Sequence, residues 1–223
     1  MKNRTFSALT VAAFLAASAA LVGCSKQAPE QGEQKTSAPA SDVIKIGVFQ
    51  PLTGANSAGG ADELEGIKLA NKLYPTALGK KVELVIVDNK SDKVEAANAA
   101  TVLTQKEKVN AVLGSWGSSL SMSGGPIFAE AKIPAVALSA TNPNVTKGNE
   151  YYFRVCFLDP FQGTVGAAYA YNTLKAKKVA IIREVSNDYS VGLTKFFVDN
   201  FVKLTGDDKA VVATADYNTG DQD

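Results

Sequence analysis

The sequence contains no histidine, only two cysteines and one tryptophan among its 223 residues. Without histidine there is no Ser-His or Cys-His catalytic pair, no HExxH zinc site and no imidazole to carry a proton. Cys24 and Cys156 are too few for a four-cysteine zinc site, an iron–sulfur cluster or a framework of disulfides. We expect Cys156 to be a small, buried apolar residue or a lone thiol without a function.

Motifs of the common enzyme classes are missing as well. The sequence has no GxSxG, SxxK or GxxxxGK(S/T) motif, and no GxGxxG opens its first helix. Hydrolase, phosphate-loop and dinucleotide-binding functions therefore have no support. Asp88 and Asp92 could be a metal pair, but their places at a strand end and a helix start favour capping. We predict that the protein is not an enzyme and has neither cofactor nor metal.

Neither sign of charge is in excess, because 23 Lys and Arg residues face 22 Asp and Glu residues. There is no run of like charges, so the sequence offers no basic patch for nucleic acid. The hydrophobic content of 46% is ordinary for a globular protein. The length allows one or two domains.

The first 23 residues have the layout of a secretory signal. Lys2 and Arg4 precede an apolar stretch from Phe6 to Leu21. The stretch ends in Leu21-Val22-Gly23-Cys24, which resembles the bacterial lipobox, whose cysteine receives a lipid. A signal-anchor helix is the alternative, but the stretch is shorter than the roughly 20 residues that span a bilayer.

We therefore predict a signal peptide over residues 1–23 and a flexible, lipidated tether over residues 24–42, rich in Gln, Ser, Glu and Pro. The protein would be exported to the periplasm or the outer cell surface. It would be held to the membrane there by lipid on Cys24.

From Val43 onward, short apolar runs alternate with segments of helical period, which predicts a doubly wound α/β fold. The runs have little polar alternation, as in strands buried on both faces of a parallel sheet. The predicted strands are Val43–Phe49, Val82–Val87, Ala111–Gly114, Ala135–Leu138, Val179–Ile182 and Ala210–Ala213. The predicted helices include Ser118–Ala131, Pro160–Leu174 and Ser190–Leu204.

The alternation breaks at Tyr151–Pro160, which indicates a passage between two α/β lobes. We place the first lobe at residues 43–158 and the start of the second at residues 159–223. The second lobe has only two clear strands and two helices before the sequence stops in a turn. We therefore expect this lobe to be incomplete and the chain to be the N-terminal part of a longer protein.

Two strand ends carry hydroxyl and small residues, at the edge where open α/β sheets bind ligands. Ser115-Trp116-Gly117-Ser118 follows one strand, and Ser118 lies at the expected start of a helix, where free N–H groups suit a carboxylate. Ser118 could instead be a plain helix cap. Ser139 and Thr141 follow the next strand, in a segment that could also be an ordinary Asn-Pro turn.

An ordered series of short motifs resembles the branched-chain amino-acid-binding proteins, the solute receptors of ABC importers. The resemblance runs from Val43 to Asp223. The motifs are Pro51-Leu52-Thr53-Gly54, Asp88 with Ser91-Asp92, the turn Gly114–Ser119, Ser139-Ala140-Thr141-Asn142-Pro143, Tyr152-Phe153-Arg154 with Asp159-Pro160-Phe161-Gln162-Gly163, and Asp188-Tyr189-Ser190.

The resemblance implies a type I periplasmic binding protein, a two-lobed clamshell in which each lobe is a parallel sheet flanked by helices. A monomer of this kind would bind an amino acid, branched-chain or similar, and dock on an ABC permease in the membrane. A ligand sensor of the same fold, signalling to a membrane receptor, is the alternative.

The resemblance also implies roles for individual residues. Hydroxyls of Ser118 and Thr141 would hold the ligand carboxylate, with backbone groups of Ser139 and Ala140 beside it. Trp116 and the turn at Gly117 would lie by the ligand, and Tyr189 would reach it from the second lobe unless it is only a helix-start aromatic. Gly59 stands where many relatives have an aromatic ring against the ligand.

Overall fold

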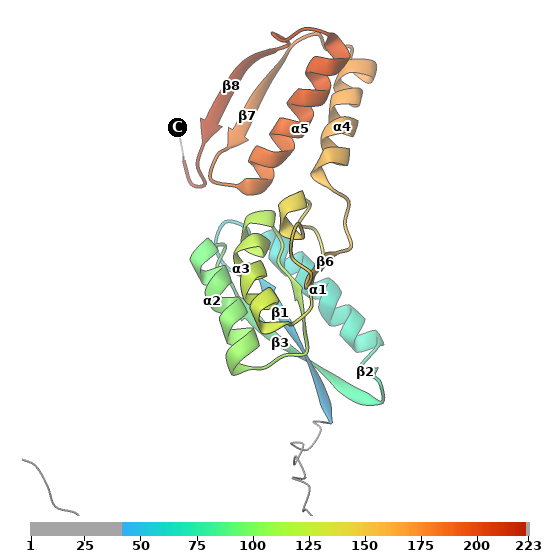
Figure 1. The fold of residues 1–223 in the computed structure, drawn as a ribbon, viewed down its shortest axis with the longest axis vertical. Coiled ribbons are helices and arrows are strands. Elements are labelled where there is room, and N and C mark those ends of the chain that lie inside the picture. Colours follow the sequence, from blue (N-terminus) through green and yellow to red (C-terminus); the bar gives the residue numbers. More distant parts are fainter. Residues whose placement is uncertain (1–41, 222–223) are drawn as a thin grey trace, which may run out of the picture. The chain divides into compact units, whose positions relative to one another are not determined.

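The computed structural model describes residues 42–221, which form two β-sheets with helices packed on them (Figure 1). The predicted signal peptide, and the tether with Cys24 up to residue 41, lie outside the described residues. The strands are β1 (Val43–Gln50), β2 (Thr76–Ala77), β3 (Lys80–Asp88), β4 (Ala111–Gly114), β5 (Ala135–Ala137), β6 (Tyr152–Arg154), β7 (Val179–Glu184) and β8 (Val211–Tyr217). The α-helices are α1 (Ser57–Leu73), α2 (Lys93–Thr101), α3 (Ser118–Ala131), α4 (Asp159–Ala168) and α5 (Asp188–Thr205).

The first sheet has the strand order β2-β3-β1-β4-β5-β6 and the second pairs β7 with β8. The α/β fold predicted from the sequence is confirmed. All neighbouring strands are parallel except β2, which pairs antiparallel with β3. The two are joined by Leu78 and Gly79, which both have positive φ, as tight hairpin turns require. The first sheet is therefore mixed at this edge, whereas a wholly parallel sheet was expected.

The first sheet buries both of its faces. Consecutive strand residues point to opposite faces, and Figure 1 shows α1 on one side of the sheet and α2 and α3 on the other. Val48 packs with Leu64 and Ile67 of α1. Its neighbour Phe49 packs on the other side, edge-on to Phe128 of α3 with ring centroids 5.2 Å apart. Burial on both sides explains why these strands read as continuous apolar runs.

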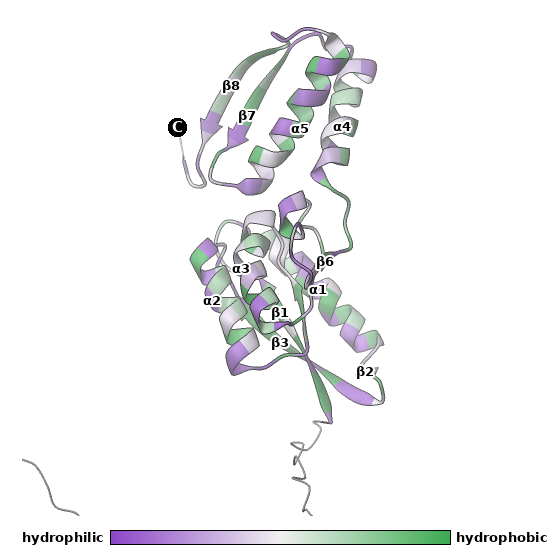
Figure 2. Ribbon diagram, viewed as in Figure 1, coloured by the Kyte–Doolittle hydropathy of each residue, from purple (hydrophilic) through white to green (hydrophobic). Residues whose placement is uncertain are grey.

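The second sheet departs from that expectation. A small core of Ala167, Phe201 and Ala210 joins α4, α5 and the residue that precedes β8. However, Val212 of β8 is 61% exposed and Ile182 of β7 is 78% exposed. Figure 2 shows hydrophobic stretches along both strands. Within the described residues, therefore, β7 and β8 are covered only in part, and the prediction that they are buried on both faces is wrong.

Helix boundaries follow local capping. Helix α3 spans the predicted Ser118–Ala131, whereas α4 starts one residue before the predicted range and passes into a π-helical segment, Tyr169–Thr173. Helix α5 starts at Asp188 because the Asn187 side chain accepts a hydrogen bond from the backbone N–H of Tyr189. Among the described helices, none has both the length and the apolar character needed to cross a bilayer. The predicted lobe division after residue 158 falls between β6 and α4 and stays a prediction.

Candidate ligand-binding site

The turn after β4 prepares the N-terminus of α3. Gly117, with φ of 87°, occupies the N-cap position, and Ser118 is the first helical residue. The interpretation of Ser118 as the cap residue is therefore wrong, because its side chain caps none of the helix amides. Instead, the buried Ser118 Oγ accepts a hydrogen bond of 3.2 Å from the backbone N–H of Asn142. The Ser118 hydroxyl proton is left to be donated to another group.

The segment after β5 supplies the second group of polar atoms. Asn142 starts the short 3₁₀ helix Pro143–Val145 by accepting from the backbone N–H of Asn144. Thr141 is only 6% exposed, and among the described residues its hydroxyl has no partner with hydrogen-bond geometry. The carbonyl of Ala140 already accepts from Arg154 Nη1 at 2.8 Å. The segment after β5 therefore forms the Asn-Pro turn and also contains the polar residues Ser139 and Thr141.

A cavity of about 250 Å³ brings most of the predicted site residues together. It is lined by Trp116, Gly117, Ser118, Ser139, Thr141, Phe157, Gln162, Asn187 and Tyr189. Six of the eight predicted residues are among them, and Ala140 and Gly59 are not. Tyr189 approaches from α5, and its hydroxyl accepts from Gln162 Nε2 of α4 at 3.0 Å. The cavity therefore has walls from elements packed on both sheets.

Three lining residues have no role in the sequence interpretation: Phe157, Gln162 and Asn187. Gln162 belongs to one of the recognised motifs, so its position beside Tyr189 could have been suspected. Phe157 precedes α4 and is 56% exposed, with no pattern in the sequence that marks it. Asn187 could be expected only as the cap of α5.

Gly59 does not line the cavity, although the family resemblance implies a place beside the ligand. A Cβ atom built on Gly59 would lie 2.3 Å from Nε1 and Cε2 of Trp116, so the indole ring lies directly against this glycine. The Trp116 ring also lines the cavity. In this chain the aromatic ring that lines the cavity near Gly59 therefore comes from the turn after β4, and Gly59 provides the room for it.

Behind Ser139 lies a carboxylate that the sequence reading missed. Ser139 Oγ donates to Oε1 of Glu63 on α1, and Gln50 Nε2 donates to Glu63 Oε2 at 2.7 Å. Oε1 of the fully buried Gln50 accepts from the backbone N–H of Trp116 at 2.7 Å. Burial raises the pKa of the Glu63 carboxyl, although the hydrogen bonds from Ser139 and Gln50 oppose the rise.

A second carboxylate lies behind Thr141. Asp159 begins α4, is completely buried, and has no hydrogen-bond partner for either carboxylate oxygen among the described residues. Burial raises the pKa of the Asp159 carboxyl, and the Thr141 hydroxyl and the positive charge of Arg154 oppose this rise. Ser139 and Thr141 thus each lie next to a carboxyl group of a residue that does not line the cavity.

In a comparison with known proteins, residues 43–223 match a family described as "Periplasmic binding protein". The chain belongs to the periplasmic binding protein family. The family resemblance predicted from the sequence is thereby confirmed.

The chain is also similar to individual proteins and solved structures. A leucine binding protein from Thermotoga maritima has 46% identity and a TM-score of 0.77, with 81% of this chain and 50% of that chain covered. A branched-chain amino acid transporter substrate binding protein from Streptococcus pneumoniae, in complex with isoleucine, has 34% identity and a TM-score of 0.74, with coverages of 81% and 51%. An amino acid binding protein from Pseudomonas aeruginosa is 37% identical over 157 residues, or 69% of this chain and 41% of the relative. The chain therefore spans about half the length of the proteins it matches.

Elsewhere in this periplasmic binding protein, the two acidic residues considered for metal binding act locally. Asp92 caps α2 by accepting from the backbone N–H groups of Val94 and Glu95. Asp88 accepts from Thr53 Oγ1 at 2.6 Å and from backbone N–H groups of the two loops around it. In the part of the chain that the structure describes, no group of three or more metal-binding side chains occurs. Cys156 is only half-buried, whereas a buried residue was expected from the sequence.

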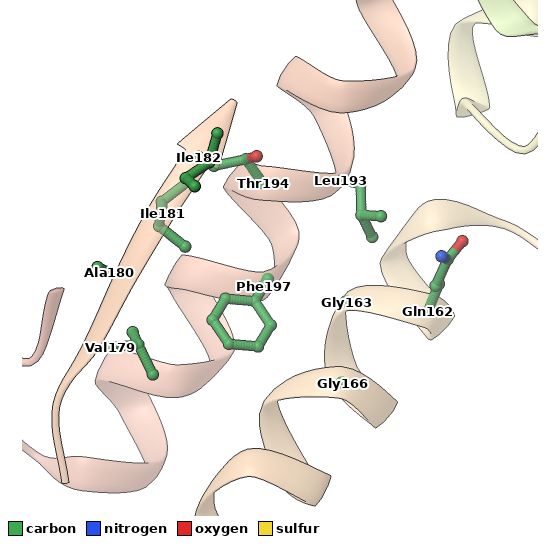
Figure 3. A pocket seen from close by; sticks show the side chains of 10 residues that line it. All are labelled: Gln162, Gly163, Gly166, Val179, Ala180, Ile181, Ile182, Leu193, Thr194 and Phe197. Atoms are coloured by element: carbon green, nitrogen blue, oxygen red, sulfur yellow. The ribbon is translucent and has the colours of Figure 1, made fainter. Parts of the chain in front are cut away.

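A second hollow, of about 410 Å³, lies between α4, α5 and β7. Figure 3 shows its lining side chains, which are mainly apolar, with Phe197 and Leu193 of α5 near the glycines of α4. Its only polar side chains are Gln162 and Thr194. The smaller cavity, with the hydroxyls of Ser118, Ser139, Thr141 and Tyr189, suits a charged small molecule better, because a charged group needs hydrogen-bond partners when it leaves water.

Proposed function

We propose that the full-length protein captures an amino acid, branched-chain or similar, outside the cytoplasm and delivers it to an ABC permease. The observation that carries the proposal is the pair of buried hydroxyls, of Ser118 and Thr141, that line one cavity at the N-terminus of α3; among the described residues, the Thr141 hydroxyl has no partner of full hydrogen-bond geometry. A buried hydroxyl without a partner costs about 1–3 kcal/mol, and a ligand that completes its hydrogen bonds recovers that cost. The leucine- and isoleucine-binding relatives support this ligand class.

The proposed mechanism is non-covalent capture. The ligand carboxylate would accept hydrogen bonds from the Ser118 and Thr141 hydroxyls and lie near the positive end of the α3 dipole. Trp116 and Phe157 would contact the apolar side chain, and Tyr189 would close the cavity from α5. No bond of the ligand is broken in this scheme, so the protein acts as a receptor and not as an enzyme. We expect it to work as a monomer.

Two hydroxyl deletions in the full-length protein test the proposal. Each charge-assisted hydrogen bond is worth about 1.5–3 kcal/mol, so Ser118→Ala and Thr141→Val should each weaken L-leucine binding about ten- to a hundredfold in calorimetric titrations. Thr141→Val keeps the side-chain shape, and the melting temperature of each variant without ligand separates a loss of stability from a loss of affinity. Ser123→Ala is the control, since Ser123 lies on the same helix, outside the cavity, and bonds to the Ser119 carbonyl. Unchanged leucine affinity in both site variants would refute the site.

We also propose that Cys24 carries the lipid anchor. The support is the lipobox-like sequence Leu21-Val22-Gly23-Cys24 after a basic and apolar leader. Cys24→Ala should prevent lipid attachment, so the variant should leave the detergent phase when cells are extracted with a phase-separating detergent. A variant that partitions like the natural protein would show that lipid on Cys24 is not the anchor.

A further inference from the structure

Glu63 contacts two groups that shape the candidate cavity but does not line the cavity itself. It lies on α1, and each of its carboxylate oxygens has one donor: the Ser139 hydroxyl on Oε1 and the Gln50 side-chain amide on Oε2. Ser139 lines the cavity, and Gln50 holds the backbone N–H of Trp116, whose ring also lines it. One side chain thus reaches two walls of the site.

The Glu63–Ser139 bond fixes which way the Ser139 hydroxyl points. A hydroxyl has a single proton, and an ionised carboxylate can only accept. Because the Ser139 proton is donated to Glu63, the atoms that Ser139 presents to the cavity are its oxygen lone pairs. Toward a ligand, Ser139 Oγ is therefore an acceptor, which suits an ammonium group and repels a carboxylate oxygen.

The Gln50 side chain is fixed at the same time. Its Oε1 accepts from the backbone N–H of Trp116 and its Nε2 donates to Glu63, both at 2.7 Å, and the residue is completely buried. A flipped amide would place an N–H group against the Trp116 N–H group and an oxygen against the carboxylate. Glu63 therefore receives a donor from Gln50 whose direction cannot reverse.

We propose that Glu63 is a positioning residue that makes Ser139 accept a hydrogen bond from the ligand ammonium group. The site then selects amino acids over the same carboxylic acids without the amino group. This inference rests on the proposed amino-acid-binding function and deepens it. It assigns the selection to a residue that does not itself contact the ligand.

Glu63→Gln in the full-length protein reverses the hydrogen-bond direction with little change of shape. Since Gln50 Nε2 still requires an acceptor, the new amide must place its oxygen toward Gln50 and its NH₂ group toward Ser139. Ser139 then accepts from residue 63, and its proton turns into the cavity. At pH 7.5 we expect L-leucine and L-valine to bind at least about tenfold more weakly. Their deaminated counterparts, 4-methylpentanoate and 3-methylbutanoate, should bind as before or more tightly.

The readout is the ratio of the two dissociation constants, acid over amino acid, which should fall at least tenfold in Glu63→Gln. Glu65→Gln is the matched control, because Glu65 lies two residues away on α1, is exposed and pairs with Lys68. Ser139→Ala should lower the ratio as well, and adding Glu63→Gln to it should change the ratio no further, as expected if the effect passes through the hydroxyl.

The outcomes separate this inference from the proposed function. If the natural protein binds leucine or valine but Glu63→Gln leaves the ratio unchanged, or weakens acid and amino acid equally, the positioning role is refuted and amino-acid binding stands. If the natural protein binds no amino acid, both are refuted. A lower ratio in Glu63→Gln that persists in the Ser139→Ala background would also refute the inference, because the effect would then not depend on Ser139.

Discussion

The Asp88 carboxylate connects two loops through several hydrogen bonds. It accepts from the hydroxyl of Thr53 at 2.6 Å, from the backbone N–H of Leu52 at 2.8 Å and from that of Lys90 at 2.8 Å. These bonds tie the loop after β1 to the loop after β3. Burial by itself raises the pKa of Asp88, but the hydrogen bonds from Thr53, Lys90 and Leu52 outweigh it, and the pKa is lowered overall.

This carboxylate gives a prediction about stability and pH. A group whose pKa is lower in the folded state stabilises the protein above its unfolded pKa of about 3.9, and this contribution is lost as pH falls through the folded pKa. Asp88→Asn should therefore lower the free energy of unfolding by about 1–3 kcal/mol at pH 7. The difference from the natural protein should shrink near pH 3. Urea unfolding at both pH values measures this, and Asp62→Asn, exposed on α1, should change it by less than about 0.5 kcal/mol. A deficit that is as large at pH 3 as at pH 7 would contradict the ionic role.

The residues of the candidate site divide by what the sequence could reveal. The sequence could identify Ser118, Ser139 and Thr141 as candidates, because they follow apolar runs and the ends of parallel strands meet at one edge of a sheet. The sequence could not reveal the contact of Gly59 with Trp116 or that of Glu63 with Ser139, because the partners are far apart along the chain. A glycine under an indole ring and a carboxylate on a helix have no local pattern that distinguishes them from exposed residues.

Among the elements, long periodic segments were predicted well and short ones were not. Helix α3 lies where its period and flanking residues placed it, although Pro126 lies inside it. The two-residue strand β2 was missed because Thr76-Ala77 is too short to show an alternation. The π-helical ends of α2 and α4 were also missed, since a π turn differs from an α turn by one residue in its hydrogen bonds and not in composition.

The contact between α4 and α5 depends on one small residue. A Cβ atom on Gly163 would lie 2.6 Å from Phe196 Cβ and 2.8 Å from the backbone nitrogen of Phe197, so the two helices approach too closely for any side chain there. Gly166, one turn further along α4, is less crowded, since its Cβ would lie 3.4 Å from a ring carbon of Phe197. The same helix therefore contains a tight glycine and a matched, looser one.

We expect the two glycines to respond in opposite ways to alanine. Gly163→Ala should lower the free energy of unfolding by about 1–3 kcal/mol, because backbone atoms of α5 must move to accept the methyl group. Gly166→Ala should be neutral or stabilising by up to about 1 kcal/mol, because alanine is the better helix former. Chemical unfolding of both variants checks this. Equal effects would show that the close approach of α4 to α5 is not maintained in solution.

At the scale of the whole molecule, the sequence predicted two lobes but could not identify the contacts between elements of the two sheets. The most concentrated of these contacts surround Asp188 at the start of α5. Its carboxylate accepts from Lys93 Nζ at 2.9 Å and from Ser119 Oγ at 2.8 Å, and its backbone N–H donates to Ser119 Oγ at 2.8 Å. Asn142 Nδ2 donates to its carbonyl at 2.9 Å. We call these four residues the Asp188 clasp.

If ligand capture involves closure of two lobes, the Asp188 clasp stabilises the closed form, and weakening it should reduce affinity without touching the cavity. Exposed ion pairs are worth about 0.2–1 kcal/mol, so Lys93→Ala should raise the dissociation constant for leucine by a factor of about 1.4 to 5, and this difference should shrink in 0.5 M salt. Ser119→Ala removes two hydrogen bonds and should weaken binding about tenfold at either salt concentration. Lys90→Ala is the control, since Lys90 pairs with Glu95 next to α2 and has a similarly exposed side chain. Titrations with leucine at low and high salt measure all three. Equal behaviour of Lys93→Ala and Lys90→Ala would mean that the contact around Asp188 contributes nothing to closure.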